Sequence, residues 1–556
     1  MEEDKKNFSS PYLMHSLDAL QRIVSLTNID NLSSTFGCSH RDYWLYKTSD
    51  FPDAVRNFSS HSFALASIHP FFNKTKQYFF RELAKSSILY WSSIQHSDGS
   101  YDEFYPYERG WVGPTAFTLY SNIEAYKIVS EEFSKKNESN IMNAFKKAAS
   151  YIAAGDKEGD DLANHHAMAY LSLTKAHELL ESNKLKKDAK KSFRNFLKYH
   201  LIDEGWSIEY DGIDPGYLSA SCSFLAKTLD IEYSQDIFEI IKIYSKTLKP
   251  FCYPDGCFSG PIGSRNTMHL YPYAFELLAK SDPNINYISK FSQFSINSGN
   301  CITPNIMSDR YVHYRVEEYL ITDKLFLEKK ATIKKDFIIE KNETYLPKGG
   351  IYHFCNENDF LTVNLSKNLV LDKYKKVENN KKWKRTSFTG IRILDKSGLY
   401  SSQFISKNSK ATFNKEKIKV KGYLAKIPTE NSFNIFKNLI FRILLIFCSN
   451  STNASNYLKK SIRKLLMFSK FKKNYYFETS FDLLSNELII RIESNKIIEP
   501  LDLQIGTNIS DRYVPQSRFS RISDQNLKSS LLNQSEKNNV INELKKNKFS
   551  TIRIKI

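Results

Sequence analysis

The chain has 556 residues, of which 41% are hydrophobic and 14% aromatic, and its formal net charge is +18. A chain of this length is expected to fold as two or three domains rather than around one core. The positive charge favours an anionic partner. Nucleic acid is not predicted, because the sequence has no zinc-finger spacing, no Gly-rich phosphate loop and no aromatic RNA-binding motif.

The seven cysteines are scattered and odd in number, which argues against a disulfide framework and favours a reducing compartment. Cys252 and Cys257 have no second pair at ligand spacing, so no metal site is predicted. The N-terminus, Met-Glu-Glu-Asp-Lys-Lys, is charged and no apolar stretch follows it. A secretory signal is therefore not predicted, and the expected location is cytoplasmic or peripheral on the inner face of the membrane.

The first 300 residues carry apolar side chains at three- and four-residue spacing, which is typical of helices. The predicted helices are 78–95, 114–133, 141–154, 161–181, 187–201, 219–229 and 234–248. Turns with an acidic residue, a glycine and then an aromatic residue recur at 97–101, 203–206 and 254–258. Unless this recurrence is a coincidence, its spacing fits helical hairpins of roughly 50 residues that close into an (α/α) toroid.

The pattern changes to short alternating runs after about residue 310, as in antiparallel strands. The predicted strands are 325–334, 360–365, 390–394, 417–424, 475–481, 488–492, 501–505 and 551–556. Helices followed by strands indicate separate domains of a multidomain α+β protein. We therefore expect an N-terminal (α/α) toroid over 1–305 and a C-terminal antiparallel β-sandwich over 306–556.

A basic, apolar insertion at 433–473 interrupts the strand pattern. Residues 433–447 are almost all apolar but contain Lys437 and Arg442, and residues 459–473 form a basic amphipathic stretch. The first run is too short and too charged to span a bilayer. Two helices that lie in the plane of an anionic membrane fit the pattern, as does an insertion that packs on the protein itself.

The tripeptide Asn164-His165-His166 and Tyr217 are the first candidates for chemistry. An amide, an imidazole and a phenol can together remove a carbon-bound proton next to a carboxylate and protonate a leaving oxygen. Tyr217 follows Pro215-Gly216 at the start of a predicted helix, and the interval from the tripeptide is about one helical hairpin. Two histidines on a helix can also be structural, so that reading stays open.

Two further clusters are candidates for substrate binding. Arg265 and His269 lie in a segment that follows Tyr217 by about one more hairpin, and Arg265 could bind a carboxylate through two hydrogen bonds or form a local salt bridge. An aromatic segment at 101–111 includes Tyr105 and Trp111. Its rings could stack on sugars or form a buried loop.

Several of these motifs resemble those of the heparinase II/III-like and alginate-lyase-like polysaccharide lyases. The likeness rests on Gly37-Cys-Ser-His-Arg-Asp-Tyr-Trp44, on the Asp98-Gly-Ser-Tyr101 turn, on Asn164-His165, on Asp214-Pro-Gly-Tyr217 and on the order of helices before strands. The resemblance implies an (α/α) toroid followed by a β-sandwich. It also implies that Asn164 binds the uronate carboxylate beside the imidazole of His165, and that Tyr217 is the acid/base phenol.

The chain also departs from that family. Its members commonly add a β-domain histidine within a His-x-His-x-x-Asp-like stretch, and this sequence has no such stretch. His313 and His353 are the remaining candidates on that side.

The predicted function is cleavage of an acidic polysaccharide or oligosaccharide containing uronic acid by β-elimination, without a metal or cofactor. In this hypothesis Asn164 and Arg265 bind the carboxylate, His165 is the base or orients it, and Tyr217 is the acid. The remaining substrate-binding candidates are His166, His269, Tyr105 and Trp111.

Three alternatives stay open. The first is a uronyl epimerase and the second a glycoside hydrolase, which would need two facing carboxylates from among Glu103, Glu108, Asp211 and Asp214. The third is a non-catalytic glycan-binding assembly factor at the membrane surface.

Overall fold

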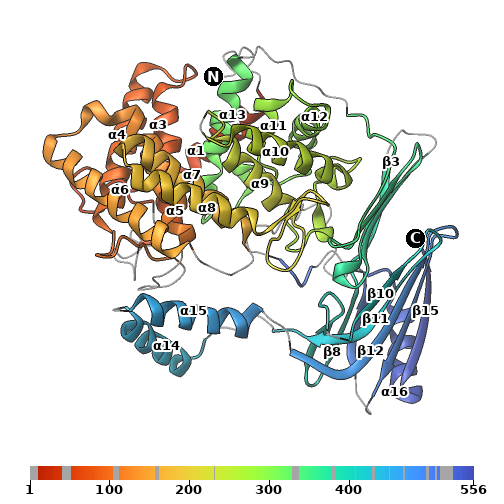
Figure 1. Ribbon diagram of the computed structural model, residues 1–556. Coiled ribbons are helices and arrows are strands. Elements are labelled where there is room, and N and C mark those ends of the chain that lie inside the picture. Colours follow the sequence, from red (N-terminus) through yellow and green to blue (C-terminus); the bar gives the residue numbers. More distant parts are fainter. Residues whose placement is uncertain are drawn as a thin grey trace.

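The molecule is a helix-rich domain followed by antiparallel sheets (Figure 1). This is a computed structural model. It describes residues 10–39, 52–103, 112–156, 162–230, 232–328, 337–377, 383–406, 408–428, 433–449, 451–467, 470–495, 500–506, 510–513 and 530–556. The order of helices before strands is as the sequence predicts.

The first part of the chain is helical, as the sequence predicts. They are α1 (Pro11–Leu26), α3 (Ser60–Ile68), α4 (Lys74–Ser93), α5 (Val112–Val129), α6 (Lys135–Gly155), α7 (Ala163–Leu180), α8 (Asn183–Leu197), α9 (Pro215–Ala226), α10 (Ser234–Leu248), α11 (Tyr273–Leu278), α12 (Pro283–Ser298) and α13 (Val316–Glu328). All the predicted helices correspond to α4 through α10, whereas α1, α3 and α11 to α13 have no predicted counterpart.

Alternate helices form a closed ring. Helices α3, α5, α7, α9, α11 and α13 each contact the next, and α13 contacts α3. The ring helices α7 and α9 are buried on nearly every side, whereas α8 buries one apolar face with Leu185, Phe193 and Phe196 and exposes lysines on the other. A helix that is apolar on one face covers a core from outside, and a helix that is buried all round lies within it.

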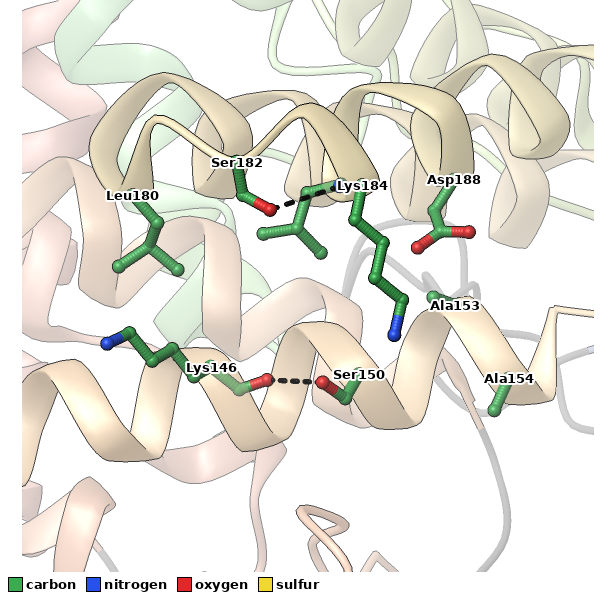
Figure 2. Close-up of a pocket in the computed structure, with 9 residues that line it drawn as sticks. Lys146, Ser150, Ala153, Ala154, Leu180, Ser182, Lys184 and Asp188 are labelled. Atoms are coloured by element: carbon green, nitrogen blue, oxygen red, sulfur yellow. Dashed lines mark hydrogen bonds between the residues drawn. The ribbon is translucent and has the colours of Figure 1, made fainter.

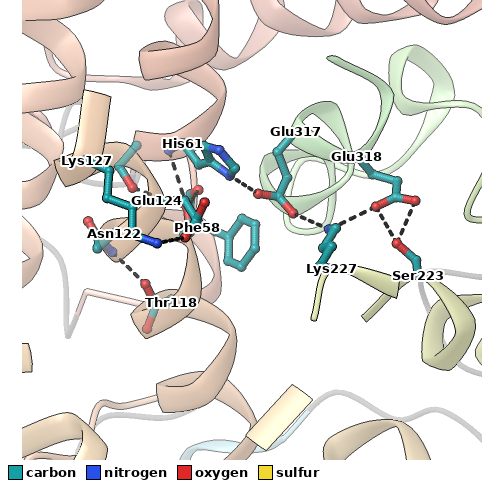
Figure 3. A network of polar contacts seen from close by, with 12 residues as sticks. Phe58, His61, Thr118, Asn122, Glu124, Lys127, Ser223, Lys227, Glu317 and Glu318 are labelled. Carbon is teal, nitrogen blue, oxygen red and sulfur yellow. Dashed lines mark hydrogen bonds and ion pairs between the residues drawn. The ribbon is translucent and has the colours of Figure 1, made fainter. Parts of the chain in front are cut away.

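A buried ionic network joins the first and last helices of this ring (Figure 3). The ammonium of Lys227, the residue after α9, lies 3.2 Å from Glu317 and 3.0 Å from Glu318 of α13. Glu317 also pairs with His61 of α3, and Ser223 donates to Glu318 at 2.8 Å. Burial alone would lower the pKa of Lys227, but the two carboxylates outweigh it and hold the pKa well above its usual value.

The three recurring acid-glycine turns are left-handed at their glycines. Gly99, Gly205 and Gly256 have φ values of 93°, 70° and 85°. A Cβ on Gly205 would lie 2.2 Å from Ile243 Cγ2, and one on Gly256 would lie 2.1 Å from Ser298 Oγ. Glycine is therefore required by both backbone angle and space.

Two antiparallel sheets follow the helices. The five-stranded sheet runs in the order β3 (Asn342–Leu346), β4 (Ile351–Cys355), β5 (Asp359–Asn364), β6 (Val370–Lys376), β7 (Trp383–Phe388). The eight-stranded sheet runs in the order β14 (Pro500–Ile505), β8 (Ile391–Asp395), β9 (Gly398–Ser401), β11 (Lys417–Lys426), β12 (Lys470–Asp482), β13 (Glu487–Ser494), β15 (Phe549–Lys555), and β10 (Lys410–Phe413) pairs with β11. Helix α16 (Gln534–Asn547) packs on the larger sheet, and the two-residue strands β1 (His200–Leu201) and β2 (Trp206–Ser207) pair within the helical domain.

The five-stranded sheet lies between the helices and the larger sheet. Successive side chains of β5 point to opposite faces, so Phe360 belongs to the core of the helical domain and Leu361 to the core shared with the larger sheet. On the helical side, Thr362 Oγ1 donates to the carbonyl of Pro250 at 2.9 Å and Asn364 Nδ2 donates to that of Ile262 at 2.6 Å. These bonds attach the sheet to the loops beside the third acid-glycine turn.

The predicted boundary at residue 305 falls inside the helical part, because α13 completes the ring. The predicted strand at 325–334 begins in that helix, where Leu325–Glu328 is helical, and its remainder lies outside the described residues. The apolar periodicity of α13 is weak because its buried side includes Glu317, Glu318 and Asp323. Glu317 and Glu318 pair with Lys227, and Asp323 pairs with His69 at 2.9 Å. Because these buried residues are polar, a periodicity of apolar residues did not reveal the helix.

The basic insertion forms two helices between β11 and β12. They are α14 (Ile435–Cys448) and α15 (Thr452–Met467), and Figure 1 shows them away from both sheets. Among the described residues, no helix combines the length and the apolar character needed to cross a membrane.

Candidate active site

Asn164 is fixed at the start of α7 by a buried carboxylate. Glu209 accepts hydrogen bonds from the Asn164 backbone N–H at 3.2 Å and from Asn164 Nδ2. Both residues are almost fully buried. Burial raises the pKa of Glu209 to about 8, although the bonds from Asn164 oppose that rise. Glu209 is therefore largely protonated at neutral pH.

This raised pKa predicts a pH-dependent stability. Folded Glu209 keeps its proton between about pH 4.5 and 8, where the unfolded carboxyl has lost it. The unfolding free energy should therefore fall with rising pH by about 1.4 kcal/mol per pH unit across that interval and level off above it. In Glu209→Gln this fall of the unfolding free energy with rising pH should be absent. Urea unfolding of both proteins across the interval measures the difference, and parallel pH profiles would contradict the prediction.

Asp214 holds the turns of Tyr217 and Arg265 side by side. As the N-cap of α9 it accepts from the backbone N–H of Tyr217 at 3.3 Å. It also accepts from the backbone N–H of Arg265 at 2.8 Å and from the Thr267 hydroxyl. Gly216 N–H in turn donates to Thr267 Oγ1 at 3.1 Å. One buried carboxylate thus brings together two segments about 50 residues apart in sequence.

The ring of Tyr217 contacts the rings of His269 and Tyr210. Its ring centroid is 6.0 Å from that of His269, nearly perpendicular to it, and 6.1 Å from that of Tyr210. The Arg265 guanidinium lies over the Tyr210 ring with Cζ 4.3 Å from the centroid. Tyr217 is partly exposed, whereas Arg265 and His269 are buried. Tyr210 is partly exposed as well, so the two tyrosines are the more exposed residues of this group.

The electrostatic environment pushes the pKa values of Tyr217 and His269 apart. Burial, with Tyr210 and Glu209 nearby, holds the pKa of Tyr217 well above its usual value. Burial and the charge of Arg315 hold the pKa of His269 well below its usual value. His269 Nδ1 has no hydrogen-bond partner among the residues that the structure describes. A protonated phenol thus lies beside a neutral imidazole.

The C-terminal domain adds two basic side chains, Arg512 and Lys367, to this region. Arg512 forms an ion pair with Asp211, whose Oδ1 is also 3.7 Å from Arg265 Nη2. Lys367, in the helical turn after β5, is buried and donates to the carbonyl of Pro261 at 2.9 Å. Burial and the nearby Arg512 hold the pKa of Lys367 well below its usual value. Asp211 is the half-exposed member of this group of charges.

The two histidines of the tripeptide have different surroundings. The His165 ring packs edge-on against Phe117 of α5, with centroids 6.2 Å apart, and lies close to Gly113. His166 is buried, with Nδ1 2.7 Å from Asp156 Oδ1, and stacks on Tyr199 at 5.0 Å. His166 therefore has the surroundings of a structural histidine, and His165 faces α5.

The other predicted residues are placed as follows. Tyr105, Trp111 and Glu108 lie outside the described residues. Glu103, a candidate carboxylate for a hydrolase, forms an ion pair with Arg310 at 3.2 Å. The other two described candidates, Asp211 and Asp214, likewise interact with protein groups, Asp211 with Arg512 and Asp214 with the Arg265 backbone N–H.

Both remaining histidine candidates are buried and hydrogen-bonded to hydroxyl groups. His313 is in the helical domain, where it bonds Ser59 Oγ at 2.6 Å, and His353 of β4 bonds Thr362 Oγ1 at 3.0 Å. Burial lowers the pKa of each to about 3. Both are therefore neutral and fully enclosed.

A cavity of about 570 Å³ lies elsewhere, between α6 and the α7–α8 hairpin (Figure 2). It is lined by Lys146, Ser150, Ala153, Ala154, Leu180, Ser182, Lys184, Leu185 and Asp188. Leu180 ends α7 and Asn164 begins it, and at 1.5 Å per residue they are about 24 Å apart. The cavity is therefore separate from the candidate site.

Sequence reasoning missed Glu209, Tyr210, Lys367 and Arg512. Glu209 and Tyr210 shortly precede Tyr217, so a search for polar residues near that turn could have found them. Arg512 and Lys367 come from the other domain, and no spacing in the sequence relates them to Arg265.

Comparisons with known proteins support a general assignment. The family model for the ulvan lyase N-terminal domain matches residues 56–287. The chondroitin AC lyase of Streptomyces coelicolor A3, solved with chondroitin sulphate, is 9% identical, with a TM-score of 0.54 over 89% of this chain and 67% of that one. A family 88 glycosyl hydrolase from Bacteroides vulgatus is 9% identical over 56% of this chain and 98% of that one, but its TM-score of 0.37 is too low for an argument. Curated proteins gave no match.

The matched segment contains Asn164, Glu209, Tyr217, Arg265 and His269. The likeness to the chondroitin lyase extends over both the helices and the sheets, and at this level of identity it concerns the fold. The fold and the family match together make this chain polysaccharide lyase-like.

Proposed function

We propose that the protein cleaves uronic-acid-containing glycans by β-elimination at the group formed by Asn164, Tyr217, Arg265 and His269. The observation that carries the proposal is a set of contacts from one short segment. Glu209 accepts from Asn164, and Asp214 accepts from Tyr217 and Arg265. The ring of His269 contacts that of Tyr217. The match to a lyase domain over the same residues supports it. The substrate is an acidic polysaccharide or oligosaccharide.

Binding of the uronate carboxylate is the first requirement, because a proton on the adjacent carbon is very weakly acidic while the carboxylate keeps its charge. Arg265 supplies a buried guanidinium whose Nε has no hydrogen-bond partner among the described residues. Asn164 keeps one amide proton beyond the one given to Glu209. In the free protein the Asp211 carboxylate lies 3.7 Å from Arg265 Nη2. A substrate carboxylate would replace Asp211 beside the guanidinium.

Proton transfer is the second requirement. Neutral His269 takes the proton from C5, the C4–O4 bond breaks as the C4–C5 double bond forms, and Tyr217 gives its proton to O4. C5 and C4 are neighbours, so the base and the acid must be close, as the 6.0 Å between the two rings allows. Return of the proton from His269 to Tyr217 restores the enzyme. His269 suits this base role better than His165, which faces α5.

We propose further that the ring of helices is an (α/α) toroid and that the two sheets form the β-sandwich of lyases with that architecture. The closed succession of contacts from α3 to α13, each inner helix with an outer partner, supports the first assignment. The apolar core shared by the two sheets supports the second.

The test is incubation with a panel of polyuronates while ultraviolet absorbance is recorded. A lyase forms an unsaturated uronate that absorbs, so we expect absorbance to rise with at least one polymer. Chain cleavage without absorbance would favour a hydrolase, and deuterium uptake at C5 without cleavage would favour an epimerase. Binding without either change would favour a non-catalytic glycan-binding factor.

Arg265→Gln tests the carboxylate site. A hydrogen bond to a charged group contributes about 1.5–3 kcal/mol, so kcat/KM should fall roughly 10- to 150-fold. Arg553→Gln, at an exposed residue of strand β15, is the control and should leave kcat/KM unchanged. Equal activity of both variants would remove Arg265 from the site. The measurement is the initial rate of absorbance change over a range of substrate concentrations.

A further inference from the structure

Helices α14 and α15 present an uncovered apolar surface beside a concentration of positive charge. Leu445 is the buried residue of α14, while the large side chains around it are exposed. Among the large apolar side chains that are exposed on α14, the exposed fractions run from 44% for Ile443 and Leu444 to 83% for Ile435. Phe436 and Phe447 are 76% and 77% exposed. Large apolar patches on a protein surface usually mark a place of interaction.

The exposed side chains follow the helical repeat. Phe436, Ile440, Ile443 and Phe447 are spaced by four, three and four residues, so they form one stripe along α14. Leu445 is about two and a half turns from Phe436 and therefore lies on the opposite side. The stripe thus points away from the side of the helix that the protein covers.

Positive charge flanks the stripe on both sides. Lys437 follows Phe436 by one residue and Arg442 follows it by six, which places them about 100° and 240° around the helix from the start of the stripe. The sequence adds Lys459, Lys460, Arg463 and Lys464 on α15, and 431–477 contains nine basic residues and no acidic one. Long basic side chains at such positions reach an anionic layer while their neighbours enter an apolar one.

We propose that the α14–α15 hairpin lies in the surface of an anionic lipid bilayer, with the Phe436–Phe447 stripe at the level of the headgroups. At 14 residues α14 is about 21 Å long, less than the roughly 30 Å of bilayer hydrocarbon, so the hairpin lies in the interface and does not cross it. This proposal is independent of the catalytic one.

Two other occupants fit the observations less well. A second copy of the hairpin would bring nine positive charges against nine, with no acidic residue in this segment to offset them. A soluble acidic polysaccharide would match the lysines and arginines, but it offers nothing apolar for the two exposed phenylalanines. An anionic membrane surface matches both features at once.

The experiment is flotation of the full chain with vesicles of phosphatidylcholine alone and of equal parts phosphatidylcholine and phosphatidylglycerol. We expect binding to the anionic vesicles only, weakened by high salt. Lys437→Gln with Arg442→Gln should lower the affinity roughly 25-fold, because each basic residue near such a surface contributes about fivefold. Phe436→Ser with Phe447→Ser should lower it at least about tenfold.

Matched controls lie outside the hairpin. Leu484, in the turn between β12 and β13, is 77% exposed like Phe447, so Leu484→Ser removes an equally exposed apolar side chain. Lys324→Gln with Lys341→Gln removes two exposed charges. Both controls should float like the unchanged protein, and circular dichroism verifies that every variant is folded.

Several results would overturn the proposal. One is that the unchanged protein does not float, and another is that it floats equally well with neutral vesicles. A third is that the control variants lose as much vesicle binding as the hairpin variants. Concentration-dependent dimers in sedimentation velocity that disappear with the phenylalanine variant would identify a second copy as the occupant. Binding of soluble alginate that needs the basic residues but tolerates the phenylalanine variant, without flotation, would identify a polysaccharide.

Discussion

Replacement of Tyr217 by Phe is expected to lower kcat about 10²- to 10⁴-fold and to leave KM nearly unchanged. A positioned general acid contributes a factor of that size, and the ring of Tyr217 lies 6.0 Å from that of His269. Phenylalanine keeps the ring contacts with His269 and Tyr210, so the site should stay folded. The measurement is the ultraviolet rate on whichever polyuronate the unchanged protein cleaves.

Tyr78→Phe is the control for that experiment. Tyr78 is exposed on α4, outside the group that Asp214 organises, and its phenol should not affect the rate. Full activity of the Tyr217 variant would show that the leaving oxygen takes its proton from another group. A parallel loss in both variants would show that the effect is not specific to the site.

Replacement of Lys227 by Met should lower the unfolding free energy of the protein by about 3–5 kcal/mol. Removal of one partner from a buried ion pair leaves the opposite charge uncompensated, and here two carboxylates, Glu317 and Glu318, would lose their cation. Because the network joins α3, α9 and α13, the ring itself should loosen. Urea unfolding followed by far-ultraviolet circular dichroism measures the change.

The pH dependence of this loss provides an internal check. Burial raises the pKa of Glu317, but Lys227 and His61 outweigh it and depress the folded pKa below 4.5. The stabilisation from this carboxylate is therefore fully present above about pH 4.5 and disappears as the pH falls through the folded pKa. The difference between the Lys227→Met variant and the unchanged protein should narrow at acidic pH.

Lys324→Met is the matched control on α13. Lys324 is exposed and lies 3.9 Å from Glu328 one turn away. Such surface pairs contribute about 0.3–0.5 kcal/mol, so the control should remain nearly as stable as the unchanged protein. Equal stability of the Lys227 variant would mean that the buried network does not hold the ring together.

The candidate site could be predicted in part from the sequence. Asn164, Tyr217 and Arg265 follow one another at intervals near 50 residues, and Asp214 joins the last two as that interval suggested. The contact of His269 with Tyr217 could not be predicted, nor could the pairing of His166 with Asp156 and its stacking on Tyr199. The direction of a buried side chain depends on its neighbours in the fold. Arg512 and Lys367 reach the site only because the domains meet there.

The sequence by itself determined the succession of helices and strands, since apolar residues repeat at the period of each element and glycines mark the turns. It also determined the helical, basic and apolar character of the insertion at 433–473. Only the tertiary structure decided where α13 belongs and which carboxylates hold the site. Those residues are buried and polar, and they form ion pairs and hydrogen bonds with partners that are distant in the chain.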